Sequence, residues 1–131
     1  MNKKVGLLGK TPIIATIPVT NLTRAQNFYQ DVLGLKPSGP FPNGIILDAG
    51  KGTGVALFRR GPVKVEHTVA WFIVDDFNEK AQALREKGVK FDEYDMGGME
   101  HLGEGIYAFA GFRAAWFKDT EGNILAIGTK A

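Results

Sequence analysis

The chain repeats one pattern of apolar, capping and glycine residues at an offset of 55 positions. A β-branched run at 13–20 leads into "TNLTRAQNFYQDVLGL", whose apolar residues recur at helical spacing, and "HTVAWFIV" leads in the same way into "DDFNEKAQALREKGV". The aligned pairs are Val19 with Val74, Asn21 with Asp76, and Tyr29 with Leu84. Each copy is too small to bury a sheet alone, so the repeat predicts two similar modules that share one core.

Each half then closes with short apolar runs that glycines divide. In the first half these runs are "IILDAG" and "TGVALFRRG", after the turn-rich link "KPSGPFPNG", and this order fits βαββ or βαβββ. In the second half they are "FRAAWFKD" and "NILAIGT". We predict an α+β fold with one domain over 1–131, built from two βαβββ modules at 10–60 and 66–130. The modules form a curved, mostly antiparallel sheet cup with the helices outside.

Composition excludes several classes of function. The 16 basic and 14 acidic residues are interspersed and give a net charge of +2, so there is no basic stripe for nucleic acid. The absence of cysteine rules out disulfides, thiolate metal sites and a cysteine nucleophile. The apolar part of "MNKKVGLLGKTP" is too short for a signal sequence or a membrane span. We therefore expect a cytoplasmic protein with no nucleic-acid or membrane partner.

Three segments carry a family resemblance that covers nearly the whole chain. The segments "IPVTNLTRAQNFYQDVLGLKP", "HTVAWFIVDDFNEKAQALREKGV" and "WFKDTEGNILAI" resemble the vicinal oxygen chelate superfamily, which includes glyoxalase I, extradiol dioxygenases and the bleomycin and fosfomycin resistance proteins. The resemblance implies a cup in which metal-dependent members place four ligands, one each on the first and fourth strands of both modules. Their divalent metal polarises an oxygen pair on the substrate.

The four positions that correspond to those ligands are all apolar. Counted from the helical "FYQDVLG" and from "DTEGN", they are Ile14, Leu57, Val69 and Ala126. The resemblance therefore implies a cup without metal or other cofactor, as in the metal-free resistance proteins, which bind a ligand by shape and aromatic stacking, often at a dimer groove. We predict a metal-free small-molecule binding protein, a homodimer, whose ligand is planar or aromatic.

Strand alternation selects further residues for the lining of the cup. It places Thr16 on the face of Ile14, and His67 and Trp71 on the face of Val69. Trp71 either stacks on a planar ligand or fills the space left by the metal as part of the core. His67, at a strand start, fits a solvated surface residue as well as a ligand-binding one. The predicted ligand-binding set is Ile14, Thr16, Leu57, His67, Val69, Trp71, Tyr107 and Ala126.

A long segment at 92–112 is predicted to form an adaptable rim over the cup. It combines many glycines with aromatic and methionine side chains that can repack around different ligands, although an ordinary solvent loop with one strand fits it too. Its candidate side chains are Tyr94, Met96, Met99, His101, Glu104, Tyr107 and Phe109.

Two other functions stay open at this point, and no residue is assigned a catalytic role. One is a lyase or dioxygenase-like enzyme that uses displaced ligands such as His67, His101 and Glu104, or metal-free acid and base catalysis. The other is a structural partner of another protein, in which the cup is filled by its own side chains.

Overall fold

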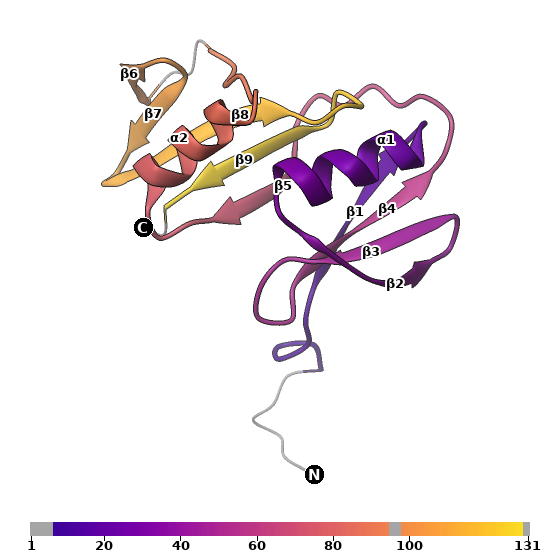
Figure 1. Cartoon of the computed structure of the whole chain (residues 1–131). Coiled ribbons are helices and arrows are strands. Elements are labelled where there is room, and N and C mark those ends of the chain that lie inside the picture. Colours follow the sequence, from indigo (N-terminus) through magenta and orange to yellow (C-terminus); the bar gives the residue numbers. More distant parts are fainter. Residues whose placement is uncertain (1–6, 95–97, 130–131) are drawn as a thin grey trace.

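The computed structural model describes residues 7–94 and 98–129, so Met96 of the predicted rim lies outside the described residues. The elements of the first half are β1 (Ile14–Val19), α1 (Leu22–Asn27), a π-helical turn η1 (Phe28–Val32), β2 (Lys36–Phe41), β3 (Gly44–Asp48) and β4 (Gly54–Arg59). Those of the second half are β5 (Thr68–Ile73), α2 (Phe77–Glu86), β6 (Glu100–Gly103), β7 (Ile106–Phe109), β8 (Phe112–Lys118) and β9 (Ile124–Gly128). Figure 1 shows the two halves as separate sheets, each with its own helix.

Both halves use the same strand order, which confirms the predicted α+β fold. The first sheet runs β1-β4-β3-β2 and the second runs β5-β9-β8-β7-β6. In each sheet the first strand pairs with the last strand in parallel, and every other pairing is antiparallel. The short strand β6 extends the second module beyond βαβββ. Strands β1 and β5 come close to each other but belong to different sheets, so the cup is divided there instead of forming one continuous sheet.

The proline-rich segment that the sequence indicated as a turn-rich link is strand β2. Its residues pair with β3 over Lys36–Phe41, with an irregularity between Pro37 and Gly39. Proline has no N–H to donate and is tolerated where a strand has a neighbour on one side only, and β2 is at the edge of its sheet.

The two predicted helices begin at equivalent capping residues. The side chain of Asn21 accepts a hydrogen bond from the N–H of Arg24, and the side chain of Asp76 accepts one from the N–H of Glu79. The first helix continues past Asn27 as a wider π turn, in which the N–H of Leu33 bonds to the carbonyl of Phe28. No helix in the described part of the chain is long and apolar enough to cross a membrane.

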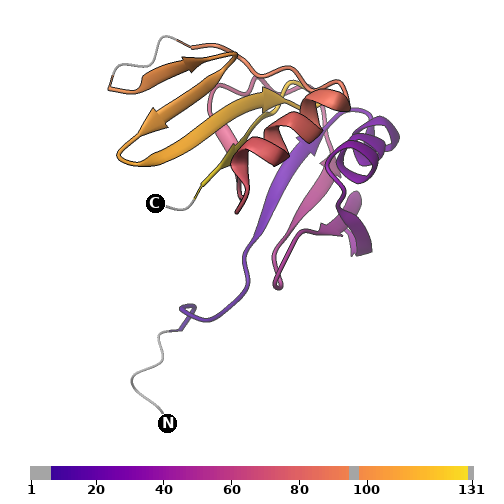
Figure 2. The same ribbon diagram turned by 60° about the vertical axis from the view of Figure 1, so that its left-hand side comes forward.

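One hydrophobic core joins the two halves. Figure 2 shows α1 and α2 side by side, and both helices pack on the same side of the sheets. Buried Ile17 and Tyr29 from the first half lie in the same cluster as Phe77, Phe117 and Ile127 from the second half. The opposite sides of the sheets, which we call the open faces, carry no helix.

The "DTEGN" turn between β8 and β9 attaches the second half to the first. Asp119 accepts a hydrogen bond of 2.7 Å from the Tyr29 hydroxyl, and it also accepts bonds from the backbone and side chain of Asn123. Asn123 in turn donates to the carbonyl of Pro18 in β1. Burial, and then the nearby Asp119 carboxylate, raise the pKa of Tyr29, so the phenol stays protonated as a donor.

Glu121 in the same turn caps the beginning of α1. Its carboxylate accepts hydrogen bonds from the backbone and hydroxyl of Thr20 and from the backbone of Asn21, and it lies 2.8 Å from Arg24. Burial of the carboxylate opposes ionisation, but the bonds from Thr20, Arg24 and Asn21 outweigh it and lower the pKa of Glu121 to about 2. The first and the third of the segments that carry the family resemblance are therefore in direct contact.

Candidate functional site

Aromatic side chains gather on the open face of the second sheet. We define the aromatic cluster as Trp71 on β5, Tyr107 on β7, Trp116 on β8, and Tyr94 and His101 beside them. The Trp71 and Trp116 rings meet edge to face with centroids 5.8 Å apart, and Tyr94 and Tyr107 pack against Trp116 at 6.2 and 5.8 Å. These geometries are the favoured ones for aromatic pairs.

Ala126 lies between the two tryptophans in the sheet. It pairs with Trp71 on one side and with Trp116 on the other, and its side chain is completely buried. A small side chain at this position lets the two indoles meet above β9. Trp116 is only 7% exposed, and its indole N–H donates to the Thr68 hydroxyl at 3.0 Å. The space above Ala126 is therefore occupied by Trp116.

Trp71 is the accessible member of the aromatic cluster. It is 41% exposed, and its indole N–H makes no hydrogen bond to any residue in the described ranges. Its ring lies against the backbone of Gly128, where a Cβ atom would overlap the indole. Trp71 therefore presents an aromatic surface and a free donor, which are the groups that a planar polar ligand requires.

The other side of the aromatic cluster is closed by the segment around Tyr94. The hydroxyl of Tyr107 donates to the carbonyl of Tyr94 at 2.7 Å and also lies against its N–H, and Tyr107 is buried. The His101 ring stacks on Tyr107 with centroids 4.6 Å apart, and its Nε2 is 3.2 Å from Glu93. Part of the predicted rim is thus a hairpin of β6 and β7, and it forms one edge of the second sheet.

A charged group borders this closed side. Asp92 lies 2.7 Å from the Lys118 ammonium and accepts a bond from the Tyr94 hydroxyl. The hydrogen bond to Asp92 raises the pKa of Lys118, while burial and then the Asp92 charge raise the pKa of Tyr94. Both shifts favour the protonated form of the group, which is the charged ammonium of Lys118 and the neutral phenol of Tyr94.

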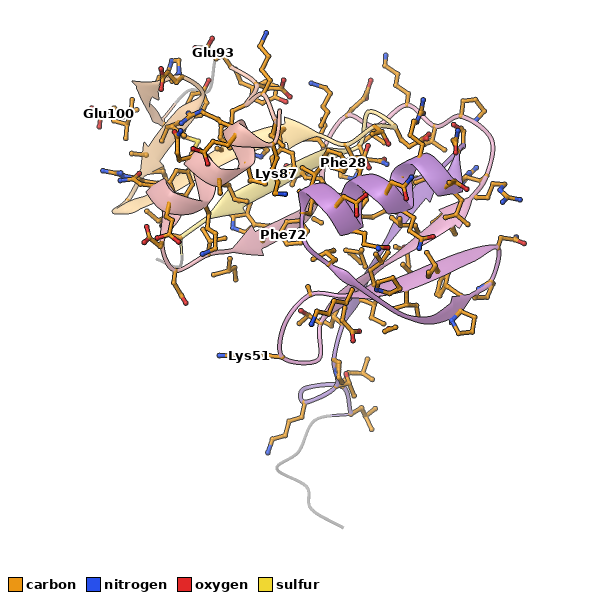
Figure 3. The ribbon with its side chains drawn as sticks, viewed as in Figure 1. Phe28, Lys51, Phe72, Lys87, Glu93 and Glu100 are labelled. Atoms are coloured by element: carbon orange, nitrogen blue, oxygen red, sulfur yellow. The ribbon has the colours of Figure 1, made fainter. Side chains whose placement is uncertain are left out.

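A large groove runs along β5 between the two sheets. It has a volume of about 980 Å³ and is mostly apolar. We call it the β5 groove; its lining comprises residues 69–75, Ile13, Ala15, Leu35, and residues 49–51 and 53–55. Trp71 lies on its border, so the exposed indole and the groove form one site. Figure 3 labels Lys51, which lies on the loop at the far side of this groove from β5.

The structure brings together only some of the predicted ligand-binding residues. Trp71, Tyr107 and Ala126 are in or beside the aromatic cluster. Ile14 and Thr16 are exposed on β1 of the first sheet, and His67 is exposed before β5. Neither His67 nor Glu104 belongs to a cluster of three His, Asp or Glu side chains in the part of the chain described.

The placement of Leu57 corrects the sequence count by one residue. Leu57 is fully buried in the main core beneath α1, because it pairs with Ile17 and shares its side of the sheet. The counterpart of Ala126 is Ala56, which pairs with Thr16 as Ala126 pairs with Trp71. The turns at 49–53 and 119–123 are equally long, and the same backbone hydrogen bond closes each of them, so Leu57 corresponds to Ile127 and the sequence count was one residue too far.

Val69 also departs from simple alternation. The pairing of β5 with β9 has an irregularity between Thr68 and Ala70, and Val69 packs against the main core. As a result Thr68, rather than Val69, reaches Trp116 on the open face. A bulge inserts one residue and thereby reverses the alternation on one side of it.

The ligand positions implied by the family do not fit a metal. Ile14, Ala56, Val69 and Ala126 have no nitrogen or oxygen atom in their side chains that could coordinate a divalent ion. Among the polar groups near the aromatic cluster, His101 Nε2 and Glu93 lie 3.2 Å apart, and Asp92 lies 2.7 Å from the Lys118 ammonium.

The comparison with known families decides the relationship. The sequence profile of the Glyoxalase/Bleomycin resistance protein/Dioxygenase superfamily matches residues 13–127. The chain belongs to this superfamily. Among curated proteins, no sequence matches significantly.

Solved structures show the same superfamily fold. The integron cassette protein HFX_CASS4 from the mobile metagenome of the Halifax Harbour sewage outfall has a TM-score of 0.69 at 17% identity, over 92% of this chain and 99% of that one. The oxidase ChaP-H2 has a TM-score of 0.61 at 27% identity, over 92% and 95%. TnmS3, an antibiotic-binding protein from Streptomyces sp. CB03234, has a TM-score of 0.61 at 19% identity, over 91% and 96%. Solved structures with this fold thus include an antibiotic-binding protein and an oxidase.

Sequence reasoning missed Trp116, one of the buried aromatic residues of the site. Trp116 lies in a strand, "FRAAWFKD", that the sequence did indicate, and alternation along it separates Ala114 and Trp116 from Ala115 and Phe117. The same alternation argument that selected Trp71 would have selected Trp116.

Proposed function

We propose that this protein is a metal-free binding protein for a planar, aromatic small molecule, which lies in the β5 groove and stacks on Trp71. The observation that carries the proposal is the exposed indole of Trp71, which is held at the border of an apolar groove by Trp116 and Gly128. The apolar ligand positions support binding without metal, since they leave nothing to polarise a substrate.

We also propose that the working form is a homodimer in the cytoplasm. Support comes from Ile13 and Ile73, which are 79% and 66% exposed at the groove, and from β1 and β5, which are edge strands there. A second copy would cover these apolar side chains. Native mass spectrometry of the untagged protein reads the oligomer mass, any bound metal and any retained organic ligand in one spectrum. A stoichiometric divalent ion would contradict the metal-free proposal.

The groove proposal is tested with 1-aminoanthracene, a neutral, planar fluorescent probe. Its emission should rise on binding to the native protein, and Trp71→Ala should weaken binding about fivefold, since an aromatic pair contributes about 1 kcal/mol beyond area burial. Phe109→Ala is the matched control, because Phe109 is 47% exposed on the same sheet but does not line the groove.

Equal loss of binding in both variants, or no loss in Trp71→Ala, would exclude Trp71 as the binding platform. The thermal midpoint of each variant is measured beside the binding curve, because a destabilised variant loses binding for a different reason.

A further inference from the structure

A second cavity lies on the helix side of the second sheet, at the seam between the two halves. It has a volume of about 240 Å³ and is lined by Phe72, Phe117 and Ile127 from the sheet and by Leu33 and Leu84 from the helical side. We call it the helix pocket. It is separate from the aromatic cluster, which lies on the open face.

The π turn η1 borders this helix pocket. The N–H of Leu33 bonds to the carbonyl five residues earlier, and Val32 and Leu33 both line the cavity. π turns are rare and are found frequently at functional sites, because the widened turn rearranges the side chains that follow it. The cavity is therefore lined partly by an irregular element of the first half and partly by α2 of the second.

Two lysines give the otherwise apolar helix pocket a positive rim. Lys80 and Lys87 line it, and no acidic residue does. The ammonium of Lys87 donates to the backbone carbonyl of Asp31 at 3.3 Å, and a carbonyl is a neutral acceptor. Within the described ranges no carboxylate lies at ion-pair distance from either ammonium. Figure 3 shows Lys87 between the two helices, close to Phe28 and above Phe72.

We propose that the helix pocket binds a small carboxylate with an apolar body, as a second ligand site on the helix side of the second sheet, which shares only Phe72 and Val74 with the lining of the β5 groove. The apolar body is removed from water against Phe72, Phe117 and Leu84, and the carboxylate meets Lys80 and Lys87 at the rim. The volume equals that of about eight water molecules in the liquid, which suits a body of roughly eight carbons. A cationic or neutral molecule of the same shape lacks the attraction at the rim.

The probe is sodium octanoate, compared with octan-1-ol and octylammonium, which carry the same chain with no charge or the opposite charge. Binding is followed by methyl NMR, in which the methyl groups of Leu33, Leu84 and Ile127 report on the helix pocket directly. Octanoate should shift these signals, and its affinity should exceed that of octan-1-ol about fivefold and that of octylammonium by more.

Three variants locate the site. Lys87→Gln should weaken octanoate about fivefold, whereas Lys64→Gln, which alters an exposed lysine elsewhere, should leave it unchanged. Ala83 is exposed on α2 and lines the helix pocket, so Ala83→Trp should fill the cavity and remove octanoate binding without altering the core.

Equal affinity for the three probes, or an unchanged octanoate affinity in both Lys87→Gln and Ala83→Trp, would overturn the proposal. So would shifts centred on Trp71 instead of the three reporter residues. Ala83→Trp should retain 1-aminoanthracene binding and Trp71→Ala should retain octanoate binding, so the two proposed sites fail or succeed independently.

Discussion

At the scale of single residues, Gly128 controls the position of Trp71. The indole lies where a Cβ atom at this position would be, so Gly128→Ala forces the ring out toward solvent. We expect a loss of about 1 kcal/mol in unfolding free energy, as for other overpacked sites, with a red shift of the tryptophan emission and weaker probe binding. Urea unfolding and fluorescence spectra measure these effects.

Gly39→Ala provides the control for that prediction, because a Cβ atom on Gly39 meets no atom within 4 Å. In a Trp71→Ala background, Gly128→Ala should cost little, since the clashing ring is gone. A full cost in that background would show that Gly128 acts on the strand rather than on the indole.

The sequence predicted the correct face of the sheet for a side chain only where inward and outward residues alternate regularly along the strand. Trp71 and Ala126 were correctly placed on one face, because β9 has no irregularity beside them. Val69 was placed on the wrong face, because the bulge beside Thr68 leaves no trace in composition. Leu57 was one residue from the position equivalent to Ala126, which is Ala56, so it lies on the opposite side of its strand.

At the scale of elements, Glu121 fixes the beginning of α1 from a turn in the other half. Its pKa of about 2 in the folded protein is below the ordinary value of 4.5, so the native state favours the charged carboxylate. The stabilisation is therefore complete above about pH 4.5 and disappears as the pH falls toward 2. Glu121→Gln should destabilise the protein by about 1–2 kcal/mol at pH 7, with a difference that vanishes near pH 2.

Urea unfolding of both proteins between pH 2 and pH 7 measures this difference. Glu66→Gln serves for comparison, because Glu66 forms an exposed pair with Lys64 and should change stability by less than about 0.5 kcal/mol. A Glu121→Gln effect that persists unchanged at pH 2 would show that the carboxylate charge is not its source.

The elements were more predictable than their contacts. Capping chemistry predicted Asn21 or Thr23 at the first helix start and an acidic cap at the second, and the caps are Asn21 and Asp76. Strand β2 was missed because its two prolines are typical of a turn. They are tolerated in this strand because it has a neighbour on one side only, and the sequence does not show which strand lies at the edge of a sheet. The contact between Tyr29 and Asp119 joins residues 90 positions apart, and local patterns carry no information on such pairs.

At the scale of the molecule, the two halves depend on each other. The main core mixes side chains from both, and the hydrogen bonds of Asp119, Glu121 and Asn123 connect them over about a hundred positions. A peptide of residues 7–64 should therefore lack a cooperative thermal transition, because it leaves its half of the core exposed. Circular dichroism measures this, and addition of a peptide of residues 65–131 should restore the transition. A cooperative transition of 7–64 alone would contradict the prediction.

The strand edges of the two sheets differ in a way that bears on how the protein behaves when concentrated. Both edge strands of the first sheet contain proline, Pro18 in β1 and Pro37 and Pro40 in β2, and proline interrupts pairing with a foreign strand. In the second sheet, β6 is four residues long, whereas β5 has neither proline nor charge along "TVAWFI". Strand β5 is therefore the edge most prone to aggregation, and a groove ligand or second copy that covers it would also keep the protein in solution.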